Sequence, residues 1–164
     1  MWLSTFTYKS IGIVHSPFKE PKNVPIQAIA SKGTAGTLEI YPEYVEGLRD
    51  LDGFSHLILI YHFHLIKEDC SLMVKPFLDN QLHGVFATRS PARPNKIGIS
   101  VVALKKIEKT TLHIQDIDII DGTPVIDIKP FVPEFDCRKT TRIGWFSGKI
   151  GKLGITKDDG RFCK

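Results

Sequence analysis

The sequence predicts a mainly β protein, folded as a small antiparallel β-barrel of a single sheet with short peripheral helices. Short apolar segments of strand character recur along the chain, turns rich in glycine and proline separate them, and one segment has a clear helical pattern. The 164 residues are enough for one domain with a substantial core. We expect a barrel domain over residues 1–137 and a basic tail over residues 138–164.

Six segments have the main strand patterns. They are residues 6–14, 37–41, 56–64, 97–107, 111–119 and 125–131. The third has largely apolar side chains on both faces, which indicates a central strand that is covered on both sides. In the last, Ile126 and Ile128 are expected on one face, and Asp127 and Lys129 on the other.

The stretches between the first strands have different characters. Residues 19–35 are polar and contain two prolines, which predicts a long loop, and loops of this length are often functional. Pro42 begins a short helix over residues 43–51, because proline is favoured at the first helical position. The apolar side chains that share one face of this helix are Tyr44, Val45, Leu48 and Leu51.

The strand over residues 111–119 changes phase in its middle. Its apolar positions are Leu112, Ile114, Ile117 and Ile119. Because side chains alternate along a strand, this spacing implies a bulge or bend near Gln115 and Asp116. Two further carboxylates, Asp118 and Asp121, lie close by. Such carboxylates fit two roles, either binding ribose hydroxyls or a cation, or stabilising the local turn.

A stiff basic loop joins a short β-segment over residues 84–88 to the strand that begins at residue 97. Pro91 and Pro94 restrict its backbone, while Arg89 and Arg93 offer planar groups that suit carboxylates and phosphates. The loop is therefore either a candidate anion site or a solvated turn with ordinary surface arginines.

Charge is distributed unevenly, although the net charge is only +4. Residues 138–164 contain eight lysines or arginines against two aspartates, together with aromatic residues and glycines. This composition fits nucleic-acid binding, and it equally fits a solvated tail.

No apolar run is long enough for a transmembrane helix, and the three cysteines form no disulfide framework or zinc pattern, so we expect a cytoplasmic protein.

Familiar catalytic and nucleotide-binding motifs are absent from the sequence. It has no phosphate-binding loop, no Rossmann fingerprint and no nucleophile elbow. His62 and His64 lie on the same side of a predicted strand, which is a spacing that a metal could use, but histidines so placed are more often core residues or residues that contact an organic ligand. We expect no metal site.

Several long motifs in colinear order resemble the TrmO (TsaA-like, YaeB-like) family, over roughly residues 8–136. They are Ser-Pro-Phe-Lys-Glu at 16–20, Val-Pro-Ile-Gln at 24–27, Gly-Thr-Leu-Glu-Ile-Tyr-Pro-Glu-Tyr at 36–44, Gly-Phe-Ser-His-Leu at 53–57, Phe-His at 63–64, residues 84–100 and residues 118–130. This sequence departs from the family pattern at Ile26, where an arginine is common, and at Lys96, where a proline is common.

The resemblance implies an S-adenosylmethionine-dependent methyltransferase that modifies N6 of threonylcarbamoyladenosine at tRNA position 37. It also implies a small antiparallel barrel and a homodimer with the cofactor near the subunit interface. Two alternatives remain, namely an S-adenosylmethionine-binding or RNA-binding module without this activity, and a methyltransferase for another acceptor.

The resemblance also implies site residues. Those matched to cofactor contacts are Ala28, Ile29, Ala30, His64, Leu65, Arg89, Ile99, Gln115, Asp116, Ile117 and Asp118. Arg89 is expected to hold the cofactor carboxylate, and Asp118 or Gln115 its ribose. Lys19, Arg93 and Lys129 are the candidates for binding anionic groups of the substrate. No general base is assigned.

Overall fold

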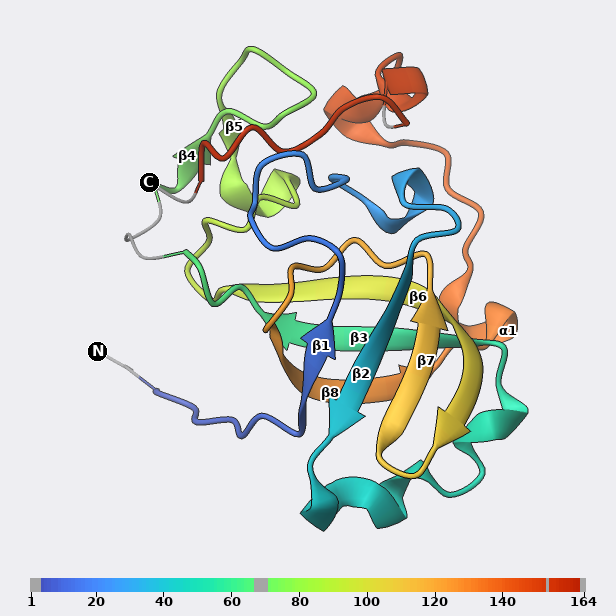
Figure 1. Cartoon of the computed structure of the whole chain (residues 1–164). Coiled ribbons are helices and arrows are strands. Elements are labelled where there is room, and N and C mark those ends of the chain that lie inside the picture. Colours follow the sequence, from blue (N-terminus) through green and yellow to red (C-terminus); the bar gives the residue numbers. More distant parts are fainter. Residues whose placement is uncertain (1–3, 67–70, 153, 163–164) are drawn as a thin grey trace.

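Six antiparallel strands form a closed barrel in the order β1-β2-β7-β6-β3-β8, and β8 pairs with β1 (Figure 1). The computed structural model describes residues 4–66, 71–152 and 154–162. The barrel strands are β1 (Gly12–His15), β2 (Ala35–Ile40), β3 (His56–His62), β6 (Ile97–Glu108), β7 (Thr111–Gln115) and β8 (Pro124–Pro130). The predicted fold class, a small antiparallel barrel with short peripheral helices, is confirmed.

The remaining elements are short and lie outside the barrel wall. Strands β4 (Met73–Val74) and β5 (His83–Gly84) form a separate two-stranded sheet. The helical elements are the 3₁₀ helices η1 (Ala28–Ala30), η2 (Pro42–Leu48), η3 (Leu51–Gly53), η4 (Val85–Ala87), η5 (Gly144–Phe146) and η6 (Ile150–Lys152), and the α-helix α1 (Pro133–Asp136). No helix in the described part of the chain is long and apolar enough to cross a membrane.

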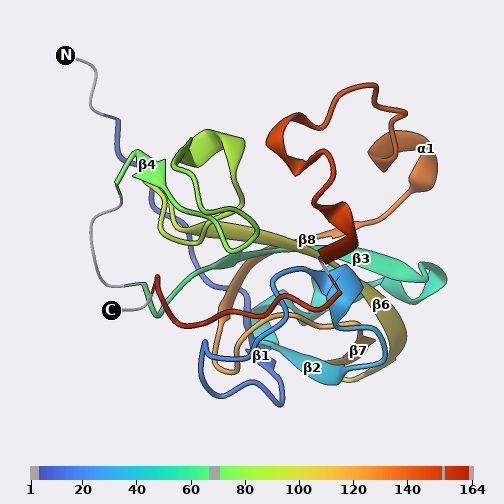
Figure 2. The ribbon, with the colours of Figure 1, turned by 90° about the horizontal axis from the view of Figure 1, so that it is seen from above.

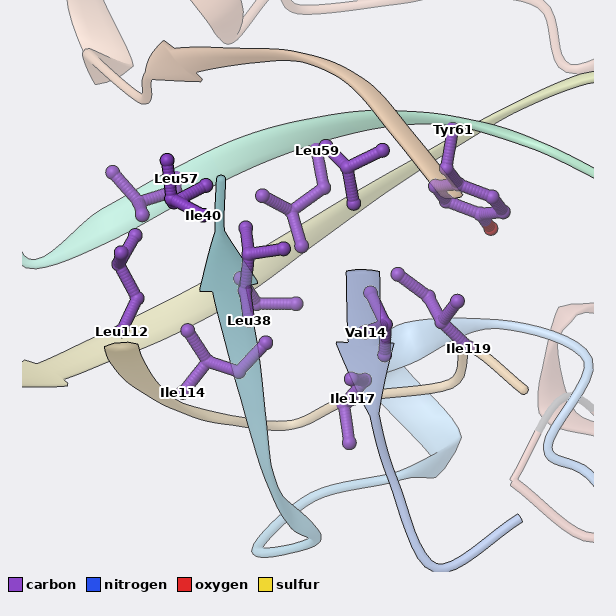
Figure 3. Packing of buried hydrophobic residues seen from close by; sticks show 12 residues of the cluster. Val14, Leu38, Ile40, Leu57, Leu59, Tyr61, Leu112, Ile114, Ile117 and Ile119 are labelled. Atoms are coloured by element: carbon purple, nitrogen blue, oxygen red, sulfur yellow. The ribbon is translucent and has the colours of Figure 1, made fainter. Parts of the chain in front are cut away.

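Aliphatic side chains from the barrel strands fill the interior, and Figure 3 shows them converging from facing strands. The buried cluster consists of Val14, Leu38, Ile40, Leu57, Leu59, Tyr61, Val102, Leu112, Ile114, Ile117, Ile119 and Val125. Burying each aliphatic side chain of this size contributes about 1.5–3 kcal/mol, so this cluster is the main stabilising term of the barrel.

The predicted change of phase after β7 is confirmed, and its cause is one residue. Asp116 adopts the left-handed backbone conformation, with φ of 66°, directly after the last residue of β7. As a result Ile117 and Ile119 are buried as fully as Leu112 and Ile114. Asp116 Oδ1 also accepts a hydrogen bond of 2.6 Å from the Gly33 amide, which fixes the bend.

Several predicted element boundaries are wrong, and β7 for example ends at Gln115 rather than residue 119. Strand β1 begins at Gly12 rather than residue 6, because pairing with β2 and β8 starts there, and Phe6 and Tyr8 are exposed. The segment over residues 84–88 leaves the β conformation at Gly84, because the amide and hydroxyl of Thr88 both donate to the Val85 carbonyl and close the turn η4.

The predicted helix over residues 43–51 is instead two 3₁₀ helices, η2 and η3. Asp50, with φ of 65°, separates them, because a residue in the left-handed conformation interrupts a right-handed helix. The predicted apolar face is confirmed, since its four residues pack against the core cluster.

The central strand and its neighbour β8 also differ from the prediction. Strand β3 ends at His62, and its outer face is partly exposed rather than covered. The register between β3 and β8 shifts next to Tyr61, which pairs with Val125 while Ile60 pairs with Asp127. Because of this bulge, Val125 and Ile128 both face the core, so the expected common face of Ile126 and Ile128 is wrong.

The left-handed conformation of Asp116 predicts different effects for two substitutions. Asp116→Ala should lower the free energy of unfolding by about 1 kcal/mol, because alanine is disfavoured in this conformation and the bond to Gly33 is lost. Asp116→Asn should be nearly neutral, because asparagine tolerates the conformation and retains the acceptor oxygen. Urea denaturation of both variants measures this, and equal losses would contradict the explanation.

Candidate functional site

A pocket of about 430 Å³ lies at one end of the barrel. Its walls come from the loop after β1, the end of β3, the start of β6, the segment after β7 and the C-terminal segment, which we define as residues 138–162. Figures 1 and 2 show this segment passing over the end of the barrel beside the loop after β1. The volume is in the range of small-molecule sites, and most of the lining is apolar.

A chain of hydrogen bonds forms the polar part of the pocket wall. Ser100 Oγ donates to Asp118 Oδ1 at 2.6 Å, and Tyr61 Oη lies 3.1 Å from Ser100 Oγ. The serine has one hydroxyl hydrogen, which goes to the carboxylate, so the tyrosine donates to the serine. The ring of Tyr61 fits here because position 98 is glycine, since a Cβ there would lie 2.3 Å from that ring.

The protonation of this chain is governed by burial. Burial raises the pKa of Asp118 to about 6, while the bond from Ser100 and the positive charge of Arg89 oppose this rise. Burial and the neighbouring Asp118 charge raise the pKa of Tyr61 above its ordinary value. A carboxylate that titrates near neutral pH inside a pocket is typical of functional sites.

Two arginines of the basic loop reach the pocket, which favours the anion-site interpretation over a solvated turn. Arg89 donates from Nη1 to Gln27 Oε1 at 2.8 Å and so connects the basic loop to the loop after β1. Arg93 Nη1 donates to the Thr88 carbonyl oxygen at 3.4 Å. Their positive charges are the ones that an anionic ligand in this pocket would meet.

Six of the fourteen candidate site residues line the pocket. They are His64, Leu65, Arg89, Arg93, Ile99 and Asp118. The ring of His64 lies beside Thr123, with Nδ1 3.3 Å from Oγ1. Burial, and then the charge of His62, lower the pKa of His64, so its ring is neutral at pH 7.

Of the other residues matched to cofactor contacts, five do not line the pocket, namely Ala28, Ala30, Gln115, Asp116 and Ile117. Ala28 and Ala30 belong to η1, and the side chain of Ile29 between them is outside the described part of the structure. Gln115 lies 3.3 Å from the Gly33 carbonyl oxygen. Asp116 bonds to the Gly33 amide, and Ile117 is part of the barrel core.

The two lysines proposed for substrate binding already have acidic partners. Lys19 pairs with Asp121 at 2.9 Å and holds the pKa of that carboxyl below its usual range. Lys129 pairs with Asp127 at 2.7 Å. Neither lysine lines the pocket.

Several pocket residues were not singled out from the sequence. Gln27 was recognised only as the last residue of the Val-Pro-Ile-Gln motif, with no role assigned, and the alternation of β3 marks Tyr61 simply as a core residue. Trp145, Phe146 and Phe162 were noted only as part of the composition of the tail.

The possible metal site at the two histidines has no support from further ligands. His62 is exposed, and the described residues contain no cluster of three or more histidine, cysteine or acidic side chains. Cys137 is free and exposed, whereas Cys70 and Cys163 lie outside the described residues.

Comparison with known proteins gives a consistent set of relatives. Residues 13–137 match the family model described as tRNA-methyltransferase O N-terminal domain. A protein of Pyrococcus abyssi, named "Probable S-adenosyl-L-methionine-binding protein", is 59% identical over 94% of this chain and 84% of its own length. The tRNA (adenine(37)-N6)-methyltransferase of Escherichia coli is 39% identical over 80% of this chain and 60% of its own length.

Solved structures give the same relationship. The crystal structure of TrmO from Pseudomonas aeruginosa superposes with a TM-score of 0.71 at 38% identity, covering 87% of this chain and 63% of that one. This chain therefore spans less than two thirds of the length of TrmO and of the Escherichia coli methyltransferase.

The buried carboxyl of Asp118 predicts a distinctive dependence of stability on pH. Its pKa is about 6 in the folded protein, against 3.8 for an ordinary aspartate, so the folded state keeps a proton that the unfolded state loses. Stability from this residue therefore falls as the pH rises from about 4 to about 6, by roughly 2–3 kcal/mol, and stays low above that window.

Asp118→Asn isolates this effect, because asparagine still accepts the hydrogen bond from Ser100 but does not titrate. The variant should be more stable than the parent protein at pH 7, and the difference should shrink towards pH 4. Denaturant titrations of both proteins between pH 4 and 8 measure it, and parallel pH profiles would rule the assignment out.

Proposed function

This chain belongs to the tRNA-methyltransferase O N-terminal domain family, and we propose that it transfers a methyl group from S-adenosylmethionine to N6 of adenosine 37 in tRNA. The name of the Pyrococcus abyssi relative supports the cofactor, and that of the Escherichia coli relative supports the reaction. The proposal includes a cytoplasmic location and a division of the chain into a barrel domain, residues 1–137, and a basic tail, residues 138–164.

The observation that carries this proposal is the composition of the pocket wall. S-Adenosylmethionine presents a carboxylate, ribose hydroxyls and an apolar adenine face. The pocket offers Arg89 for the carboxylate, Asp118 for the hydroxyls, and apolar side chains such as Leu65 and Ile99 for the adenine. These residues lie within the part of the chain that the family model matches.

Asp118 is better placed than Gln115 for the ribose contact. Asp118 lines the pocket, and Ser100 holds its carboxylate at a fixed position. Gln115 does not line the pocket, and its amide nitrogen instead donates to the Gly33 carbonyl. Because the sequence left both residues as candidates, the pocket geometry is the reason for preferring Asp118.

Methyl transfer from a sulfonium depends mainly on alignment, because the cofactor itself supplies an electrophilic methyl group when it is bound. The protein therefore has to hold donor and acceptor in line and exclude water. The apolar walls of the pocket serve the second purpose, and the hydrogen-bonded chain from Tyr61 to Asp118 provides a rigid polar edge for the first.

We further propose that the acceptor is adenosine 37 in its threonylcarbamoylated form, as the family resemblance implies. The threonyl carboxylate of that base is an anion, and Arg93 is the pocket arginine that remains for it once Arg89 holds the cofactor. Lys19 and Lys129 receive less support, because each is paired with an aspartate outside the pocket.

The direct test is an incubation of the protein with S-adenosylmethionine labelled on its methyl group and with tRNA that does or does not carry the threonylcarbamoyl group. Label in the modified tRNA alone supports the complete proposal. Label in both tRNAs supports an adenosine methyltransferase without this requirement. Cofactor binding with no transfer would favour a binding module or a methyltransferase for another acceptor.

An exposed apolar patch supports the proposed homodimer. The outward faces of β3 and β6 are apolar at neighbouring positions, because Ile58 pairs with Val101 and Ile60 pairs with Ile99. Ile97, Ile99, Val101 and the nearby Phe86 are all exposed. Monomeric proteins seldom leave such a patch uncovered, and Ile99 also lines the pocket, which agrees with a cofactor bound near the interface.

Val101→Asp should convert the proposed dimer into a monomer, because a carboxylate would be buried without a partner at the centre of this patch. Sedimentation equilibrium measures the change. Ile155→Asp is a matched control, because Ile155 is 81% exposed and belongs to neither β3 nor β6. A parent protein that is already monomeric would refute the dimer.

Arg89→Ala should weaken S-adenosylmethionine binding about ten-fold or more, because a charge-assisted hydrogen bond to a carboxylate is lost. Calorimetric titration measures the dissociation constant. Arg49→Ala removes an exposed arginine at the end of η2 and should leave that constant unchanged. An unchanged constant in Arg89→Ala would remove this residue from the cofactor site.

A further inference from the structure

The C-terminal segment is fastened over the pocket, although it lies outside the residues that the family model matches. Its first half is held at two places. Trp145 Nε1 donates to the Ala87 carbonyl at 2.7 Å, next to the basic loop. Lys149 pairs with Asp79, and this bond, followed by the one from His83, holds the pKa of that carboxyl below its usual range.

The second half of the segment is held by the backbone. The Asp158 amide donates to the Val24 carbonyl at 2.9 Å, and the Asn23 amide donates to the Asp158 carbonyl at 2.8 Å. Phe162 then packs edge-on against Phe77, with ring centroids 5.1 Å apart. The segment is therefore anchored on both sides of the pocket.

The two sides of the pocket differ in chemistry. The barrel and its loops contribute the polar groups already assigned to the cofactor, Arg89 and Asp118. The C-terminal segment contributes mainly apolar and aromatic groups, together with Asp158. They are Ile143, Trp145, Phe146, Ile150 and Phe162.

The same segment presents positive charge to solvent. Its exposed cations that have neither an acidic partner nor a side-chain hydrogen bond among the described residues are Lys139, Arg142, Lys152 and Lys157. An aromatic surface bordered by such cations is what a single-stranded RNA requires, because its bases stack on aromatic rings while its phosphates contact lysine and arginine. S-Adenosylmethionine has no phosphate, so these cations favour the RNA as the occupant of this side.

We propose that the C-terminal segment is the acceptor side of the pocket, with the ring of Phe146 stacking on the target base and the four cations contacting the flanking phosphates. This assignment rests on the proposed function and adds to it the residues that select the acceptor. Phe146 is preferred to Trp145. The indole is fixed through its N–H and stacks on both His83 and Phe146, with centroids 4.5 Å and 3.9 Å apart, whereas the ring of Phe146 stacks only on Trp145 among the described residues.

The test measures the binding of the parent protein and of Phe146→Ala to two RNA hairpins that mimic the anticodon arm. One hairpin carries adenosine at position 37, and the other is abasic there. Phe146→Ala should weaken binding of the first hairpin about ten-fold and leave binding of the abasic hairpin unchanged, because stacking requires the base. The affinity for S-adenosylmethionine, measured by calorimetry, should stay within two-fold of the parent.

Two further variants make the result specific. Phe146→Leu keeps an apolar side chain of similar size without the aromatic ring, so it should show the same loss even if Phe146→Ala is poorly folded. Phe135→Ala removes an exposed phenylalanine of α1 that does not line the pocket, and it should bind both hairpins like the parent.

The outcomes separate this inference from the proposed function. If the parent protein methylates tRNA but Phe146→Ala binds both hairpins normally, the acceptor assignment alone is wrong. An equal loss of affinity for both hairpins also overturns the assignment, since the ring would then contact the RNA backbone. A loss of affinity for the cofactor overturns it too, since the ring would then contact the cofactor. If the parent binds neither hairpin and transfers no methyl group, the proposed function fails as well.

Discussion

The left-handed conformation of Asp116 is the constraint on which both the core and the pocket depend. Leu112 and Ile114 are at even-numbered positions, and Ile117 and Ile119 at odd-numbered ones. The turn at Asp116 lets all four point into the barrel, so that Ile117 and Ile119 continue the packing begun by β7. The same step turns Asp118 towards the pocket and Ser100. The Asp116 carbonyl also accepts a hydrogen bond from Ser31 at 2.8 Å, which fixes the loop that carries η1.

The pocket contains a carboxyl group that the fold does not need. Burial makes the ionised form of Asp118 unfavourable, and one hydrogen bond from Ser100 with the charge of Arg89 offsets this only in part. A core made purely for stability would contain an apolar side chain at this position. The buried acid is thus a physical indication of function that does not depend on any comparison with relatives.

Much of the barrel could be predicted from the sequence, because alternation of apolar residues is a local property. The phase change near Asp116 is an example, whereas the bulge opposite Tyr61 depends on pairing between distant strands and left no clear local signal. Three residues that were selected from the family motifs, Arg89, His64 and Asp118, line one pocket. The position of the C-terminal segment over the pocket could not be predicted from the sequence, because it is set by contacts between distant residues, such as that of Asp158 with Val24.

The closure of the barrel has a consequence for the order of folding. The pairing of Gly12 with Val125 joins two ends of a loop of more than one hundred residues, and such closure is entropically costly and slow. Hairpins such as β6 with β7 require only local contacts and are expected to form earlier. The C-terminal segment docks on loops that the closed barrel positions, so the pocket is expected to be the last part of the molecule to form, and a nascent chain can complete it only after residue 162 is synthesised.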